Sequence, residues 1–456
     1  MVSSALVVTL LACIASTCVF SLDVAIINSL NVMQSFQNCT VENLALFATI
    51  LLCSNLKYRT DFELTPDLGG LNVTILYVGC VFAVPFAGFV LDKLGRRRGL
   101  MVGSAIALLG AILQASAQEK VQLLLGRFLL GISFIITGTG APSWLMEVGP
   151  PKYREEITNA MVACLPITGM VGGIIYLGVY NKTSNWAWRA GLMADIVGPA
   201  IALLILPFAP ESIRWLVAKD GADEAFEVLI KISQRNRNDP ELLAEFQQIK
   251  QTVELEVQMR QRDSWKSLVS PARNFRRFLI TVLTNVFFQT NGSNFLPYFL
   301  TIIIRGTGVT DTLTLLQANV GLTAWAALCS MFGVWMLLNY SYPPEILKYT
   351  QRARGVGVGQ ALGYLIGAGM SYAIPLAIQN ISWRYYIINC LWNVPIFVVI
   401  WWLFPETKGK TLEEIDSIFD GSTAEPSKQV IEGVEDHLMG DVYRGVGSKA
   451  PKDPHG

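Results

Sequence analysis

The chain has 456 residues, of which 52% are hydrophobic and only 15% are charged, and its formal net charge is zero. A soluble chain would carry roughly 25% charged residues, so the composition excludes an ordinary soluble domain and favours an integral membrane protein. The zero net charge provides no basic field for nucleic acid. The two histidines, His437 and His455, lie near the end of the chain, which argues against a histidine-based metal site or catalytic triad. We therefore expect no metal, no cofactor and no enzymatic activity.

Apolar stretches that are long enough to cross a bilayer recur along the chain. A helical span needs about 20 mostly apolar residues, and the sequence contains ten such stretches, which predicts an all-α membrane protein. Lys and Arg are concentrated in the segments that are cytosolic if the N-terminus lies inside, and the positive-inside rule favours that orientation. The predicted spans are residues 4–30, 71–91, 99–117, 121–146, 158–180, 188–208, 278–304, 312–338, 356–378 and 385–404.

The loops between the spans divide the chain into four parts. Residues 1–208 hold six predicted spans and residues 278–404 hold about four. Between them, residues 209–277 form a polar cytosolic loop whose helical periodicity predicts short amphipathic helices. Residues 405–456 form a cytosolic tail that is rich in Gly, Ser, Pro and charge, and we expect most of it to be disordered. Residues 38–61 include an apolar segment that is too short to cross the membrane.

A short motif occurs twice, once in each set of spans. The segment EVGPPKYR at residues 147–154 follows the fourth predicted span, and EILKYTQR at residues 345–352 follows the eighth. Each places an arginine seven residues after a glutamate, at the inner end of a span. Because transporters are often built from two repeated halves, we interpret the two sets of spans as related halves.

Five motifs in this order resemble those of the sugar porters of the major facilitator superfamily. Besides the repeated motif, they are GFVLDKLGRR at 88–97, Gly126-Arg127 at the start of span four, PESIRWL at 210–216 and PETKGKTLEE at 405–414. They look most like the fungal hexose and lactose permease-like branch. The resemblance implies a two-bundle transporter that moves a hexose or disaccharide by alternating access, in symport with protons. It also implies a monomer in the lipid bilayer of the plasma membrane.

Charged residues of these motifs gather at the predicted cytosolic ends of the spans. Pairs of opposite charge there can latch the two halves while the site faces outward, and they must separate when it opens inward. The alternative interpretation is that these charges only set the topology and contact lipid headgroups. The predicted gate residues are Asp92, Arg96, Arg97, Glu147, Arg154, Glu211, Arg214, Glu345, Arg352 and Glu406.

Two opposite charges lie within predicted spans, Asp23 in the first and Arg127 in the fourth. A charge near the middle of a bilayer costs about 2.5–3.5 kcal/mol on insertion scales and usually marks an ion or proton pathway. The segment SLDVAII at residues 21–27 resembles a first-span pattern of the family whose acid is linked to proton coupling. The resemblance therefore implies that Asp23 couples protonation to movement, with Arg127 as its partner. A static buried ion pair is the alternative.

Polar residues of the seventh predicted span are candidate sugar contacts. The segment QTNGSNFLPY at 289–298 resembles the sugar-contacting pattern of the family, which implies contacts from Gln289, Asn294 and Tyr298. An amide both donates and accepts hydrogen bonds, which suits neighbouring sugar hydroxyls. Asp195, in the sixth span, is a further candidate. The alternative role of these side chains is hydrogen bonding between helices.

The second half is shorter than the family pattern implies. The family has twelve spans, and the deficit falls within residues 278–404, where we expect 312–338 to merge two family helices. Two alternatives to transport therefore stay open. The chain could be a non-transporting nutrient sensor or scaffold, or an inactive product of a truncated or mis-joined gene.

Overall fold

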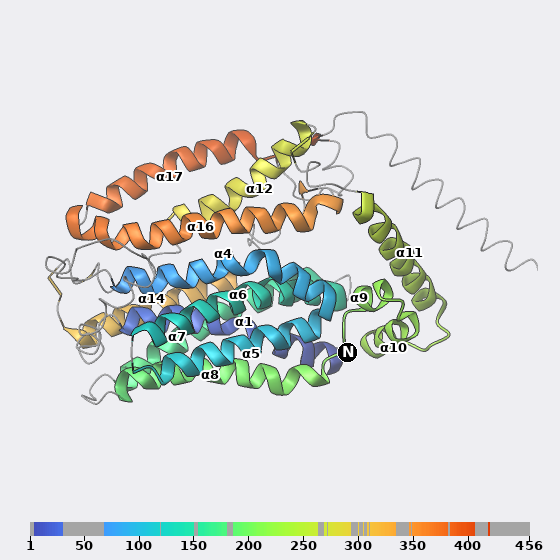
Figure 1. Ribbon diagram of the computed structural model, residues 1–456, viewed down its shortest axis with the longest axis horizontal. Coiled ribbons are helices and arrows are strands. Elements are labelled where there is room, and N and C mark those ends of the chain that lie inside the picture. The colour runs from blue at the N-terminus through green and yellow to red at the C-terminus, as the bar shows by residue number, and fades with distance from the viewer. Residues whose placement is uncertain are drawn as a thin grey trace, which may run out of the picture.

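The computed structural model is almost entirely helical where it describes the chain (Figure 1). The segment 38–61, most of the tail after residue 405, and the site residues Asn294, Tyr298, Glu345 and Glu406 lie outside the described residues. The helices of Arg154 and Arg352 are described, but their side chains are not. The described residues are 4–30, 68–118, 120–149, 154–179, 186–262, 269–270, 272–292, 300, 304, 308–309, 311–333, 346–347, 349–381, 384–405 and 418–419.

Six long helices form the N-terminal half and lie side by side (Figure 1). A helix satisfies its own backbone hydrogen bonds, so an apolar run of this length can cross a bilayer without an unpaired amide. In this half α1 packs against α6, α7 and α8, while α5 and α4 both pack against α6. The six helices are α1 (Ser4–Leu30), α4 (Leu68–Leu94), α5 (Arg96–Ala115), α6 (Lys120–Val148), α7 (Arg154–Val179) and α8 (Trp186–Ile205).

The helices of the central loop pack against one end of this half. The 3-10 helix η1 (Leu206–Phe208) leads from α8 to α9 (Ile213–Ala218), α10 (Ala222–Ser233) and α11 (Pro240–Arg262). The buried face of α10 belongs to the same hydrophobic core as Trp144 and Leu145 of α6, so the loop helices and the bundle share one core. The prediction of short amphipathic helices fits α9 and α10, whereas α11 is 23 residues long.

The C-terminal half contains α12 (Ala272–Thr290), α14 (Thr312–Gly333), α16 (Tyr349–Ile381) and α17 (Arg384–Leu403). Within the described part of the chain, nine helices are long and apolar enough to cross a membrane, and they coincide with nine of the ten predicted spans. The remaining prediction, 278–304, begins in α12 and continues into residues outside the description. The fold is therefore the predicted all-α membrane architecture.

Among the described helices, two extensive contacts join the halves, and α14 also touches α1, where Asn319 donates to the Ser29 hydroxyl at 3.1 Å. Helix α16 packs along α4, and α14 packs along α7. The repeated Glu and Arg motif leads into both α7, which begins at Arg154, and α16, which begins at Tyr349, so we interpret these two helices as counterparts. The two contacts are then equivalent if α14 is the counterpart of α4. On this assignment α14 corresponds to one family helix, while the prediction that 312–338 merges two helices stays a prediction, because residues 334–338 lie outside the described residues.

Part of the tail docks on the inner end of the C-terminal half. Phe419 is buried with Ile280 and Ile346, and its ring lies 4.7 Å from the guanidinium carbon of Arg277. Arg277 is itself fully buried and donates a hydrogen bond to the Ile346 carbonyl at 3.1 Å. A cation over an aromatic face is attracted to it, so this contact orders the tail at Ile418–Phe419.

Glycines allow the closest helix contacts. A Cβ added at Gly131 of α6 would meet backbone atoms of Leu76, Gly79 and Cys80 on α4. Backbone atoms cannot rotate away, so these two helices require glycine here. A second glycine series on α16, with one glycine per turn, packs against polar side chains of α12; it comprises Gly359, Gly363 and Gly367 against Thr281, Asn285 and Gln289.

Replacing Gly131 with alanine should destabilise the protein by about 1–3 kcal/mol, because the added methyl group forces α4 and α6 apart. The melting temperature of a detergent-solubilised fluorescent fusion, followed by size exclusion, measures the effect. Gly138→Ala on the same helix is the matched control, since its Cβ would meet only the Phe134 ring at an ordinary 3.7 Å. Equal stability of the two variants would contradict the close approach.

Candidate functional site

An ion pair is buried inside the N-terminal half. Arg127 on α6 donates from Nη2 to Oδ2 of Asp23 on α1 at 2.6 Å. The two side chains are 0% and 1% exposed. Asp23 Oδ1 and Arg127 Nε and Nη1 have no hydrogen-bond partner among the described atoms. The structure thus brings together the two residues predicted for proton coupling, and it leaves part of their hydrogen-bonding capacity unused.

Asp195 lies close to this pair. Its side chain on α8 is fully buried, and neither carboxylate oxygen has a hydrogen-bond partner among the described atoms. It interacts electrostatically with both Asp23 and Arg127. Tyr176 on α7 packs over Gly191, one turn before Asp195, and joins the same cluster. Two buried acids therefore share one arginine, an arrangement in which any change of protonation changes the net charge of the core.

The candidate sugar contacts are only partly placed. Gln289 on α12 is 3% exposed, and its amide lies against Gly367 of α16, beside Tyr77 of α4. It therefore lies where the two halves meet, whereas Asp195 lies within the N-terminal half. Asn294 and Tyr298 fall outside the described residues. The roles of all four in sugar binding stay predictions.

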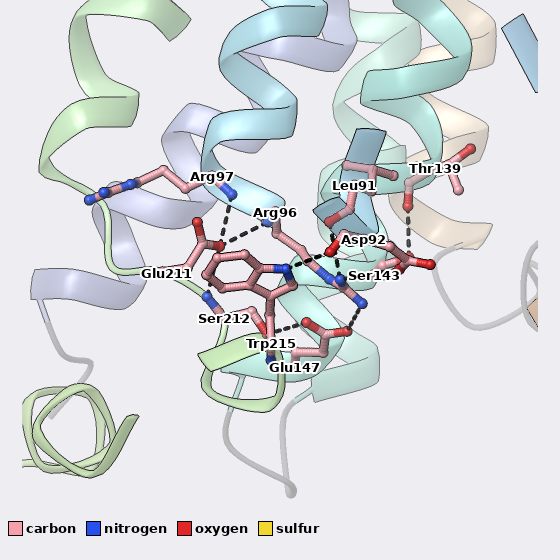
Figure 2. Close-up of polar contacts among 10 residues, drawn as sticks. All are labelled: Leu91, Asp92, Arg96, Arg97, Thr139, Ser143, Glu147, Glu211, Ser212 and Trp215. Carbon is pink, nitrogen blue, oxygen red and sulfur yellow. Dashed lines mark hydrogen bonds and ion pairs between the residues drawn. The ribbon is translucent and has the colours of Figure 1, made fainter. Parts of the chain in front are cut away.

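Glu211 caps the start of α5, at the end of the bundle that is predicted to be cytosolic (Figure 2). Its Oε1 accepts hydrogen bonds from the backbone N–H groups of Arg96 at 2.9 Å, Arg97 at 3.0 Å and Ser212 at 3.0 Å. The first N–H groups of a helix lack intrahelical partners and carry partial positive charge, so a carboxylate satisfies them well. Gly95 permits this approach, because its φ is 93° and a Cβ there would lie 2.6 Å from the Glu211 carboxylate.

Arg96 and Glu147 extend this network to α6 and α9 (Figure 2). Arg96 donates to Glu147 Oε1 at 2.9 Å and lies 3.6 Å from Asp92. The other oxygen of Glu147 accepts from the Ser212 hydroxyl, which also accepts from the backbone N–H of Trp215 at 3.2 Å. The Trp215 indole N–H donates to the Asp92 carbonyl at 2.9 Å. One chain of contacts thus ties the inner ends of α4, α5, α6 and α9 together.

Every contact of this network lies within the N-terminal half. It joins five of the predicted gate residues, Asp92, Arg96, Arg97, Glu147 and Glu211, but it holds one half together and does not itself latch two halves. Arg214 lies half-buried on α9. The side chains of Arg154, Glu345, Arg352 and Glu406 lie outside the described residues, so a latch that uses them stays a prediction.

Ser212 and Trp215 are members of the network that the sequence reasoning missed. Both lie in the segment PESIRWL, in which only Glu211 and Arg214 were predicted as gate residues. A serine at a helix start is a common N-cap, and Ser212 caps α9 in this way. That local signal was available from the sequence, whereas its bond to Glu147 required the fold.

The family described as "Sugar (and other) transporter" matches the chain at residues 8–340 and 334–419. The chain belongs to this sugar transporter family. The two matched stretches overlap at residues 334–340, between α14 and α16. The family and its members are membrane transporters rather than enzymes, so the protein is a multi-pass membrane transporter of this family.

Curated relatives of this sugar transporter come from fungi and bacteria. The MFS-type transporter oryC of Aspergillus oryzae is 26% identical over 422 residues, which cover 77% of each chain. The high-affinity glucose transporter of Kluyveromyces lactis is 22% identical over 444 residues, which cover 79% of each chain. The galactose-proton symporter of Escherichia coli K12 is 26% identical over 313 residues, which cover 68% of this chain and 64% of the relative.

Solved structures show the same fold. The proton:xylose symporter XylE, bound to 6-bromo-6-deoxy-D-glucose, has a TM-score of 0.66 at 18% identity, covering 91% of this chain and 99% of the other. The inward open conformation of XylE from E. coli has a TM-score of 0.64 at 18% identity, covering 91% and 100%. At this level of identity the likeness establishes the major facilitator fold alone.

Replacing Glu211 with alanine should lower the free energy of unfolding by about 2–3 kcal/mol, because three backbone N–H groups lose a charged acceptor. Thermal stability of the detergent-solubilised protein measures the loss. Glu227→Ala is the matched control, since that half-exposed glutamate pairs with Arg237 on the surface and should change stability by no more than about 0.5 kcal/mol. If both variants melt alike, Glu211 does not cap α5 as described.

Proposed function

We propose that this transporter carries a hexose or a disaccharide across the plasma membrane together with a proton, by alternating access. The observation that supports it best is the buried Asp23–Arg127 pair at 2.6 Å, which joins the first and fourth predicted spans. Relatives named as a galactose-proton symporter and a glucose transporter are consistent with a sugar substrate. The working unit we propose is a monomer in the bilayer.

Because this pair is buried, protonation of Asp23 changes which arrangement of the surrounding helices is favoured. A charged pair in a low-dielectric core is tolerated only while both members compensate each other. When Asp23 takes up a proton it becomes neutral, and Arg127 is left with Asp195 as the remaining acid in the cluster. The two protonation states therefore favour different arrangements of α1, α6 and α8. A proton bound in one orientation and released in the other shifts the equilibrium between orientations.

The sugar would bind where both halves can contribute. Gln289 belongs to the C-terminal half but lies beside Tyr77 of the N-terminal half, across Gly367. An amide at this boundary can exchange its contact with the α16 backbone for a sugar hydroxyl when the halves separate. Asn294 and Tyr298 follow Gln289 in the chain and are proposed to complete the contacts. Asp195, on α8 of the N-terminal half, is proposed as a further contact.

One observation favours the alternative of a non-transporting sensor or scaffold. Helix α17 packs against α16, and most of its large apolar side chains are exposed, including Leu391, Phe397, Trp401 and Trp402. In a complete second half, further helices would cover part of this surface. A protein that binds sugar but has lost the second half's full set of spans could report sugar without moving it. A truncated or mis-joined gene product would show neither binding nor flux.

Labelled glucose, galactose and xylose should accumulate in a transporter-null host at acidic pH and accumulate less at neutral pH or with a protonophore. Asp23→Asn should reduce accumulation by about tenfold or more, as expected when a pathway charge is removed, while exchange of sugar across the membrane persists. Asp311→Asn, at an exposed acid just before α14, is the matched control and should behave like the unmodified protein.

Three other outcomes would contradict part or all of the proposed function. Uptake that ignores both the protonophore and Asp23→Asn would exclude proton coupling and leave facilitated transport. Sugar binding without any flux would favour a sensor. A protein that binds none of these sugars and moves none of them would contradict the sugar assignment.

A further inference from the structure

A small pocket lies beside Asp23 within the N-terminal half. It has room for about one water molecule. Helices α1, α4 and α6 enclose it, and among the described residues all of its lining belongs to the N-terminal half. Its lining combines apolar side chains with four hydroxyl groups and one carboxylate; the polar members are Ser16, Thr17, Asp23, Ser133 and Thr137.

The polar atoms of this pocket are mostly acceptors. Ser16 and Thr17 donate their hydroxyl protons to the Cys13 carbonyl at 2.9 Å and 2.8 Å, and Thr137 donates to the Ser133 carbonyl at 3.0 Å. Their remaining lone pairs are free to accept. Asp23 Oδ1 is buried without a hydrogen-bond partner among the described atoms. A buried acceptor that has no hydrogen-bond donor costs free energy. A water molecule in this space would supply a donor to these acceptors.

We propose that this pocket holds a water molecule that relays protons between Asp23 and the cytosolic half of the bundle. This inference rests on the proposed proton coupling and specifies its route. The Asp23 carboxylic acid gives its proton to the water, leaving a carboxylate and a hydronium ion. The hydronium passes one proton to water that enters from the cytosolic side when the transporter opens inward, and it becomes water again. The hydroxyl oxygens stabilise the transient positive charge as acceptors.

The position of the hydroxyls gives the relay its direction. Ser16 precedes Asp23 by seven residues on α1, which places it about 10 Å nearer the N-terminal, cytosolic end of that helix. Thr137 follows Arg127 by ten residues on α6 and lies further inward by about 15 Å. The hydroxyls therefore extend from the buried acid toward the cytosol and not toward the outer surface.

Aromatic rings control access to the pocket from the boundary between the halves. Phe20 and Phe134 line it and stack with their ring centroids 3.9 Å apart. Tyr364 of α16 meets Phe134 edge-on at 6.2 Å. Phe134 thus lies between the pocket and a ring of the C-terminal half. Movement between the halves displaces Tyr364, which links hydration of Asp23 to the orientation of the transporter.

The charged and titratable side chains around Asp23 lie outside the pocket. Among the described residues, Arg127 on α6, Asp195 on α8 and Tyr176 on α7 interact with it electrostatically. None of the three lines the pocket. Removing pocket hydroxyls therefore changes the route of the proton without changing the charges around the acid.

The test uses the purified full-length chain in proteoliposomes that contain a pH-sensitive dye, with glucose, galactose and xylose each supplied as a gradient. The double variant Thr17→Val, Thr137→Val removes two hydroxyls at nearly constant volume. Sugar-driven proton entry should slow by about tenfold or more, as for the loss of a hydrogen bond to a charged group, while sugar exchange at equal pH stays unchanged. Thr9→Val is the matched control, because Thr9 is buried on α1 and bonds to the Ala5 carbonyl but does not line the pocket.

The outcomes separate this inference from the proposed function. If Asp23→Asn abolishes sugar-driven proton entry but the double variant behaves like Thr9→Val, the relay is refuted and proton coupling stands. If Asp23→Asn has no effect, proton coupling itself fails, and the relay fails with it. Should the double variant not fold, as judged by size exclusion, Ser133→Ala takes its place with the same expected slowing and the same refuting result.

Discussion

A carboxylate and a guanidinium that are both removed from water constrain the rest of this molecule. Asp23 and Arg127 lie on helices far apart in the sequence, and each would be expensive to bury without the other. Their contact at 2.6 Å therefore fixes how α1 approaches α6. Because α4 must also pack closely on α6 through Gly79 and Gly131, the pair and the glycines together hold three helices around one water-sized pocket. The proposed proton chemistry follows from that confinement.

The inner end of the same half is held by a different kind of interaction. Glu211 and Glu147 bring negative charge to the start of α5, where backbone N–H groups and Arg96 need partners. This network makes the N-terminal half a single body, in the sense that α4, α5, α6 and α9 cannot move independently at that end. In the part of the chain that the structure describes, the C-terminal half has fewer long helices, and its α17 packs against α16. The two halves can therefore move relative to each other at the α4–α16 and α7–α14 contacts, while the N-terminal half moves as one unit.

Much of this architecture could be predicted from the sequence, since an apolar run of span length has few alternatives in a membrane. The pairing of Asp23 with Arg127 was also predictable, because each charge needs the other. Other contacts join parts of the chain that are far apart in sequence, and no local pattern reveals them. Glu211 accepts hydrogen bonds from the start of α5, and the Phe419 ring packs on the Arg277 guanidinium. The pocket hydroxyls were missed because a serine or threonine in a span usually bonds its own helix, as Thr17 does. The place of Asp195 beside Asp23 depended on how α8 packs against α1.

The most direct test of the account is a measurement of the pH gradient at which net sugar flux vanishes, in proteoliposomes held at zero membrane potential with a known sugar gradient. If proton and sugar move together through the Asp23 site, a larger sugar gradient requires a larger opposing pH gradient to stop the flux. A flux that vanishes only when the sugar concentrations are equal, whatever the pH gradient, would contradict the account.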